Sequence, residues 1–106
     1  MDLRELLEGT VLFDWDEWNV QKNWNKHRVQ PSECEDLFFN DPVFDFDRSH
    51  SQKKERFFAY GVTEKGRHLF VAFTIRRGKV RVISARDMSR KERRFHREKA
   101  KENSTL

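Results

Sequence analysis

Residues 69–86, with the sequence LFVAFTIRRGKVRVISAR, decide the fold. Apolar side chains occupy every second position from Leu69 to Ile75, which is typical of a strand with one buried face. Arg77-Gly78-Lys79 has the composition of a tight turn, and Val80–Arg86 then returns antiparallel. The stretch therefore predicts a β-hairpin with a central strand.

Two more strands are predicted upstream of the hairpin. Val43–Asp47 alternates with a period of two, and Arg56–Val62 is rich in aromatic residues. The polar loop Arg48–Lys54 separates them, and Thr63–Gly66 is a turn that leads into the hairpin. The whole is an antiparallel meander of three or four strands.

A helix over about 17–28 is predicted before the strands, with Asp16 as its N-cap. Val20, Trp24 and His27 share one face, which we expect to be buried. The other face is polar and partly basic. It carries Trp18, Lys22, Asn25 and Lys26.

A second helix is expected to begin near Pro31, a residue suited to the first helical position. Cys34, Leu37 and Phe38 follow at helical spacing and form its buried stripe. Before both helices, Leu12-Phe13 is a short β-like segment.

The C-terminal part of the chain predicts a polar helix within residues 89–102. Ser89 and Glu92 form a capping box at its start. Phe95 and Ala100 are its only interior apolar residues, so the helix is either solvated or completed by a partner. The fold class is α+β: one domain over residues 1–106, with N-terminal helices packed on a three- to four-stranded antiparallel sheet.

The net charge of +4 conceals a gradient along the 106 residues. Residues 1–47 carry 12 acidic and 4 basic side chains, a charge of −8, whereas residues 48–75 carry +4 and residues 76–106 carry +8. Either the two ends neutralise each other in the fold, or the basic part binds a polyanion and the acidic part a basic partner.

The composition excludes several classes of protein. Cys34 is alone, which excludes a disulfide framework within the chain. The apolar run Leu69–Phe73 is too short to cross a bilayer, and residues 1–10 lack the pattern of a signal peptide, so we expect a reducing cytosol. The histidines have no metal-ligand spacing and no cofactor-binding motif is present, so neither a metal nor a cofactor is expected.

Basic side chains crowd the hairpin. They are Arg76, Arg77, Lys79, Arg81 and Arg86. Because Val80 and Val82 point to one face of the sheet, Arg81 is expected on the other. Arginines beside aromatic residues on a sheet face fit single-stranded RNA, whose phosphates pair and whose bases stack. The alternative is a solvated hairpin whose cations discourage aggregation.

His27 and Glu55 are two further candidates for chemistry. His27 lies among basic residues at a helix end, which suits an acid–base group in a phosphate site or a structural role at the helix dipole. Glu55 is a carboxylate in a basic stretch and suits a general base or an ion pair at a strand edge.

A series of short motifs spans about residues 11–97. In order they are Phe13-x-Trp15-Asp16, Asn23-x-x-Lys26-His27-x-Val29, Asp41-Pro42, Glu55-Arg56-Phe57, Tyr60-Gly61, Arg81-Val82-Ile83-Ser84-Ala85-Arg86 and Glu92-Arg93. In this order and spacing they resemble the BrnT family, the toxins of type II toxin–antitoxin pairs.

The resemblance implies a RelE/ParE-like fold and a metal-independent endoribonuclease that inhibits translation in the cytoplasm. It also implies a hetero-oligomer with a cognate BrnA-like antitoxin, an RNA substrate, and contact with operator DNA only through the toxin–antitoxin complex. No membrane partner is implied. The polar C-terminal helix and the acidic N-terminal half then become candidate partner surfaces.

Attack of the ribose 2′-OH on the adjacent phosphate needs a base, an acid and cations. We predict Arg67, Arg81 and Arg86 as charge stabilisers, Glu55 as the base, and His27 as an acid or phosphate ligand. The predicted RNA-binding residues are Lys22, Lys26, Arg76 and Arg77.

The chain departs from the family pattern at three positions. Arg28 replaces a glycine, Asn19 a lysine and His96 a tyrosine. If that lysine or tyrosine acts in catalysis, the role here falls to Lys22 or His96. A non-catalytic nucleic-acid-binding or adaptor module remains the alternative function, because it fits the basic hairpin equally well.

Overall fold

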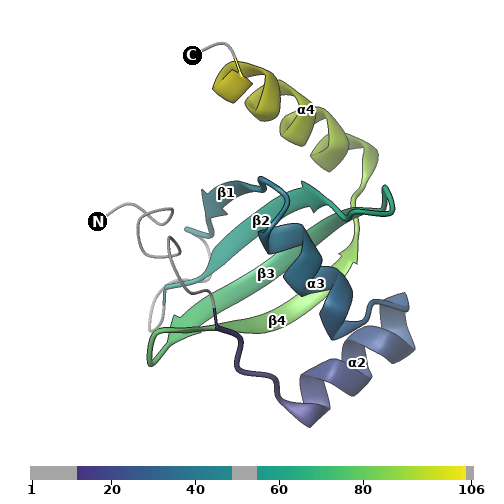
Figure 1. Cartoon of the computed structure of the whole chain (residues 1–106), viewed down its shortest axis with the longest axis vertical. Helices are drawn as coiled ribbons and strands as arrows, with labels where there is room; N and C mark the ends of the chain where they lie inside the picture. Colours follow the sequence, from purple (N-terminus) through teal and green to yellow (C-terminus); the bar gives the residue numbers. More distant parts are fainter. Residues whose placement is uncertain (1–11, 49–54, 105–106) are drawn as a thin grey trace.

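A four-stranded antiparallel sheet forms the centre of the molecule in a computed structural model that describes residues 12–48 and 55–104 (Figure 1). Its strands lie side by side in chain order: β1 (Val43–Phe46), β2 (Phe57–Val62), β3 (His68–Arg76) and β4 (Lys79–Asp87). The predicted α+β class and antiparallel meander are confirmed. The predictions for residues 1–10 and 49–54 lie outside the described residues.

Helices α2 (Glu17–His27) and α3 (Pro31–Phe38) lie on one face of the sheet, and α4 (Arg90–Ser104) extends from its end (Figure 1). Across the described ranges, none of the helices combines the length and the apolar character needed to cross a membrane. Phe13 pairs with Val80 in a single parallel bridge beside β4, where the sequence predicts a β-like segment.

The main core lies between the sheet and these two helices. Leu69, Val71 and Phe73 of β3 are fully buried there and pack with Leu37 and Phe38 of α3. The predicted stripe of α3 is therefore confirmed. A Cβ on the glycine of β2 would come within 2.9 Å of Leu37 Cγ, so Gly61 lets α3 approach the sheet closely.

A smaller apolar cluster lies on the opposite face, where Tyr60 packs with Phe58 and Phe70. Phe95 of α4 joins it, with its ring centroid 4.7 Å from that of Tyr60. The capping box at the start of α4 is present: Glu92 N–H donates to Ser89 Oγ, and Ser89 N–H donates to Glu92 Oε1. The first turns of α4 therefore hold the helix against the sheet, whereas residues 97–102 are exposed.

The turn between β3 and β4 has two residues with positive φ, Arg77 at 54° and Gly78 at 76°. This is the backbone of a type I′ turn, whose twist matches that of the flanking strands. The tight hairpin predicted from the sequence is confirmed.

The pairing of β3 with β4 contains a β-bulge. Ala72 pairs with Ser84, but the next residue of β3, Phe73, pairs with Val82. Ile83 is therefore the extra residue of the bulge. A bulge of this kind twists the strand and turns its backbone groups away from the ladder.

Helix α2 meets β4 at this bulge through polar side chains. The Nζ atom of Lys22 donates to the carbonyl of Ile83 (2.9 Å), and the Oδ1 atom of Asn23 accepts from the N–H of Ala85 (3.3 Å). Asn23 is 3% exposed, whereas Trp24 is 38% exposed. The predicted buried face was wrong, because backbone groups at the edge strand require hydrogen-bonding partners rather than apolar cover.

Arg28 caps the C-terminal end of α2 and has a left-handed backbone conformation (φ 54°, ψ 42°). A glycine adopts this conformation without the steric cost that a Cβ brings. The resemblance implies a glycine at this position, and the left-handed backbone agrees with that expectation. The guanidinium of Arg28 lies 5.2 Å from the ring centroid of Trp24 and recovers part of the cost.

We expect Arg28→Gly to raise the free energy of unfolding by about 0.5 kcal/mol. The relief of left-handed strain is about 1 kcal/mol, and loss of an exposed cation–π contact offsets about half of it. Urea denaturation measures the change. Arg28→Ala keeps the strain and loses the contact, so it should be less stable than the wild type; a Gly variant no more stable than the Ala variant would contradict this explanation.

Candidate functional site

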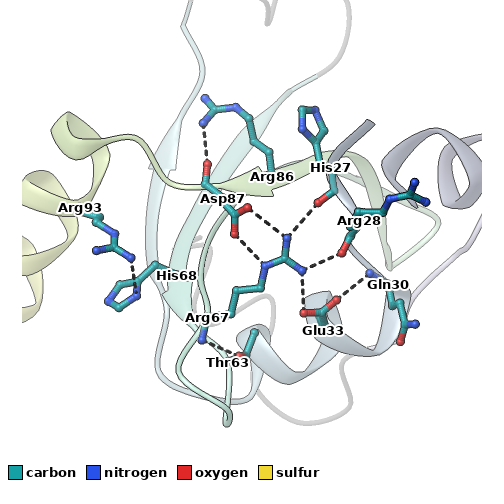
Figure 2. Close-up of polar contacts among 10 residues, drawn as sticks. All are labelled: His27, Arg28, Gln30, Glu33, Thr63, Arg67, His68, Arg86, Asp87 and Arg93. Atoms are coloured by element: carbon teal, nitrogen blue, oxygen red, sulfur yellow. Dashed lines mark hydrogen bonds and ion pairs between the residues drawn. The ribbon is translucent and has the colours of Figure 1, made fainter. Parts of the chain in front are cut away.

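Arg67 lies just before β3, where the ends of α2 and β4 and the start of α3 meet (Figure 2). Its guanidinium donates to the carboxylates of Asp87 (2.8 and 3.2 Å) and Glu33 (3.0 Å). It also donates to the backbone carbonyls of His27 (3.0 Å) and Arg28 (2.8 Å). These contacts use all five N–H donors that an arginine has.

The Arg67 side chain therefore has no donor left for a substrate phosphate. Hydrogen bonds from its guanidinium to Asp87 and then Glu33 raise its pKa, so the group stays charged at any physiological pH. Its contacts fix the left-handed end of α2 and the end of β4 relative to each other. The geometry thus suits a positioning role better than the predicted role in charge stabilisation.

Asp87 is the centre of a cationic cluster at this end of the sheet. Hydrogen bonds from Arg67 lower the pKa of Asp87, and the charges of His27 and Arg93 act in the same direction. Arg86 Nη1 donates to the backbone carbonyl of Asp87 (3.2 Å). Two arginines and a histidine therefore act on the carboxylate of Asp87, and a third arginine binds its backbone carbonyl, which makes this end of the sheet a candidate anion-binding site.

Arg86 points from β4 across the ring of Phe70, with its Cζ atom 4.5 Å from the ring centroid. Two of its nitrogens bind the carboxylate of Glu92 in α4 at 2.7 Å each. Burial raises the pKa of Glu92, but hydrogen bonds from Arg86 and Ser89 outweigh burial, so the pKa is lowered overall. The side chain of Arg86 is 36% exposed and keeps N–H donors beyond those three bonds.

Two more histidines lie at the border with α4. Arg93 Nη2 is 3.4 Å from His68 Nδ1 (Figure 2). Burial lowers the pKa of His96, His68 lowers it further, and Asp41 opposes both. His96, the residue that replaces the family's tyrosine, is thus next to the cationic cluster.

Arg81 and Arg86 lie on the same face of β4. Arg81 pairs with Thr74 and Arg86 with Phe70, and these partners are four residues apart on β3. Arg81 forms ion pairs with Asp14 (3.5 Å) and Asp16 (2.7 Å), so it lies apart from the Asp87 cluster. As predicted, Val80 and Val82 are in the core and Arg81 is on the other face.

The remaining predicted residues are spread over the molecule. Glu55 is exposed, and its backbone carbonyl accepts from Thr74 Oγ1 (2.7 Å), so it is nearer to Arg81 than to Arg86 in the sheet. Arg76 and Arg77 are exposed at the hairpin turn. Lys22 binds the bulge, and Lys26 is exposed on α2.

The fold thus brings Arg67, Arg86 and His27 together and keeps Glu55 and Arg81 away from them. Sequence reasoning missed Asp87, His68 and Arg93. A usable signal was present, because a hairpin turning at 77–78 places residues near 68 opposite residues near 87. Among the described residues, no group of three or more metal-ligating side chains is found.

The carboxylates of this cluster make the stability depend on pH. Asp87 and Glu92 have pKa values below their ordinary 3.8 and 4.5, so they stabilise the fold above those values and lose this contribution as the pH falls through the lowered ones. We expect the melting temperature to fall below about pH 4.5, and Glu92→Gln to flatten that dependence. Thermal unfolding between pH 3 and 7 tests this; Glu98→Gln, on an exposed part of the same helix, should follow the wild type.

The sequence and the fold both agree with one family. The family model for the ribonuclease toxin BrnT of type II toxin–antitoxin systems matches residues 15–92. The chain belongs to the BrnT toxin family. This match includes Trp15 at its start and Glu92 at its end, and therefore most of the Asp87 cluster.

A solved structure supports the fold. The ribonuclease toxin BrnT of Brucella abortus, determined at 1.1 Å, is similar with a TM-score of 0.56 and 23% sequence identity. The match covers 76% of this chain and 100% of that chain. At this identity the likeness shows the BrnT fold alone. A comparison with curated protein sequences finds no match.

Proposed function

We propose that this BrnT-family protein is a metal-independent endoribonuclease that inhibits translation and is neutralised by a cognate antitoxin. The observation that carries the proposal is the cluster of His27, Arg86 and Arg93 at Asp87, of which all but Arg93 lie in the part of the chain that matches the ribonuclease family. A polyanion is the ligand that such a cluster suits. We also propose a RelE/ParE-like relationship for the fold.

In this mechanism the ribose 2′-oxygen attacks the adjacent phosphorus while a base removes its proton. The bond from phosphorus to the 5′-oxygen breaks, and that oxygen takes a proton from an acid. We assign the role of the acid to His27, because histidine is the side chain that most often transfers protons in catalysis. Arg86 stabilises the charge on the phosphorane oxygens, and Arg67 holds His27 and Asp87 in place.

Asp87 is a poor candidate for the base, because its cationic neighbours lower its pKa. Glu55 as the base and Arg81 as a charge stabiliser stay predictions, and both residues lie on the hairpin side of the sheet. Lys22, Lys26, Arg76 and Arg77 are proposed to bind phosphates outside the reacting group.

A non-catalytic nucleic-acid-binding module is the second candidate. The ion pairs favour it: Arg81 is held by Asp14 and Asp16, and Arg86 by Glu92, so neither cation is fully available. For cleavage, the phosphate must either bind Arg86 together with Glu92 or displace Glu92 from Arg86. Binding without cleavage would establish the module and exclude the enzyme.

For the antitoxin, we propose the acidic side of the helical layer. A groove of about 710 Å³ lies between α2 and α3 and is lined by Trp24, Val29, Glu35 and Asp36 among others. The carboxylate of Glu35 accepts from the indole N–H of Trp15, and that of Asp36 accepts from the backbone N–H of Glu64. Operator DNA is contacted only by the complex, a hetero-oligomer in the cytoplasm.

The test is incubation of the partner-free protein with unstructured RNA in EDTA. We expect cleavage that persists with the chelator and leaves a strand with 2′-deoxyribose at the scissile position intact. Cleavage that stops in EDTA would exclude the metal-independent mechanism. Binding to both strands with no cleavage would exclude the enzyme altogether.

A further inference from the structure

Trp18 is the most exposed large hydrophobic residue in the described part of the chain, at 75%. It stands in the first turn of α2, where its backbone N–H donates to the N-cap Asp16 (2.7 Å). The capped helix start holds the backbone of Trp18, and its indole belongs to neither core cluster. A large aromatic ring that is exposed to water on a helix suits stacking against a flat ligand.

The indole borders a hollow of about 240 Å³ on the outer face of α2. Its lining residues are Trp18, Gln21, Lys22, Asn25 and Lys26. Their spacing of three and four residues places them along one side of the helix. Gln21 Nε2 donates to Asn25 Oδ1 (3.0 Å), which fixes the two amides beside the two lysines.

The two lysines supply positive charge at defined positions. Lys22 is fastened to the carbonyl of the β-bulge at Ile83 and keeps two more N–H donors for a phosphate. Lys26 is one turn further along and is exposed. Next along the chain is His27, which belongs to the Asp87 cluster. The lysines therefore line a path from Trp18 to the candidate site.

We propose that this face of α2 binds single-stranded RNA, with one base stacked on Trp18 and the neighbouring phosphates on Lys22 and Lys26. The inference rests on the proposed function, because it supplies that site with an approach for its substrate. An aromatic ring with flanking cations recognises nucleic acid without regard to sequence. The face contrasts with the groove around Glu35 and Asp36, whose charge repels phosphate.

The experiment measures binding of the full chain to a fluorescein-labelled 2′-O-methyl 12-mer, which cannot be cleaved by 2′-OH attack. We expect Trp18→Ala to weaken binding about tenfold and Trp18→Phe to retain most of it. Phe39→Ala is the matched control, since Phe39 is 65% exposed at the end of α3 and should have no effect. Lys22→Gln and Lys26→Gln should each reduce the salt slope by about 0.7.

Equal affinity of the wild type and Trp18→Ala would overturn the inference, as would an equal loss in Phe39→Ala. If Trp18→Ala lost binding to the antitoxin but kept its affinity for RNA, this face would bind a protein partner, and the inference would be overturned. Because the probe has no 2′-OH, these results do not depend on cleavage. Absent cleavage of natural RNA would count against the proposed enzyme while leaving the binding result standing.

Discussion

Arg67→Ala is expected to lower the free energy of unfolding by about 3 kcal/mol and the melting temperature by roughly 15 °C. The substitution removes five hydrogen bonds at once and leaves Asp87, Glu33 and two carbonyls without their common donor. Hydrogen bonds to charged groups contribute about 1.5 kcal/mol or more each. Partial exposure of the site reduces the total, because water replaces some of the lost bonds.

Urea denaturation of the purified variant measures this loss. Arg67→Lys keeps the charge but has three donors on one nitrogen instead of a five-donor fork, so we expect it to recover less than half of the loss. Arg76→Ala, at an exposed residue at the far end of β3, should change the stability by less than about 0.5 kcal/mol. A loss below 1 kcal/mol in Arg67→Ala would contradict the positioning role.

Arg86→Ala is expected to slow RNA cleavage by about 100-fold, as is usual when a donor to a developing oxyanion is removed. Glu92→Gln tests the role of Arg86 by changing its ion-pair partner. It removes the carboxylate that occupies two nitrogens of Arg86, so the rate should be maintained or increased while stability falls slightly. Initial cleavage rates, measured with a parallel urea denaturation, separate the chemical effect from unfolding.

Arg81→Ala is the comparison variant, because Arg81 lies on the same face but is paired with Asp14 and Asp16 outside the Asp87 cluster. A smaller effect than that of Arg86→Ala is expected. If Arg86→Ala retained the full rate, the charge-stabilising assignment would be wrong. Equal losses in Arg86→Ala and Glu92→Gln would instead show that the ion pair matters only for structure.

Features determined by neighbouring residues could be predicted from the sequence. The I′ turn at Arg77-Gly78 and the capping box of Ser89 and Glu92 depend on local backbone preferences, which the residue types express directly. The apolar stripe of α3 follows from helical spacing in the same way.

The face of α2 and the partners of the arginines could not be predicted in this way. Asn23 is buried because the edge of β4 presents an unpaired N–H at Ala85, a fact of tertiary structure that the helical pattern does not contain. Likewise, all five donors of Arg67 go to groups brought from three other elements. Basic residues in the sequence indicate a site for an anion. Only the fold shows which of these side chains are already bound by carboxylates and carbonyls of the protein itself.

The bulge at Ile83 has a consequence for the parity of β4. Arg81 and Arg86 are five positions apart, an odd number, and on an unbroken strand they would face opposite sides of the sheet. Ile83 is one residue too many for the pairing with β3. Odd-numbered residues before it and even-numbered residues after it therefore point to the same face of the sheet. If Ile83 were paired as a regular strand residue, either Arg81 or Arg86 would turn to the core side, whereas deletion of Ile83 would leave both arginines on one face. The bulge is therefore the feature that lets two arginines at an odd spacing share one face of the sheet.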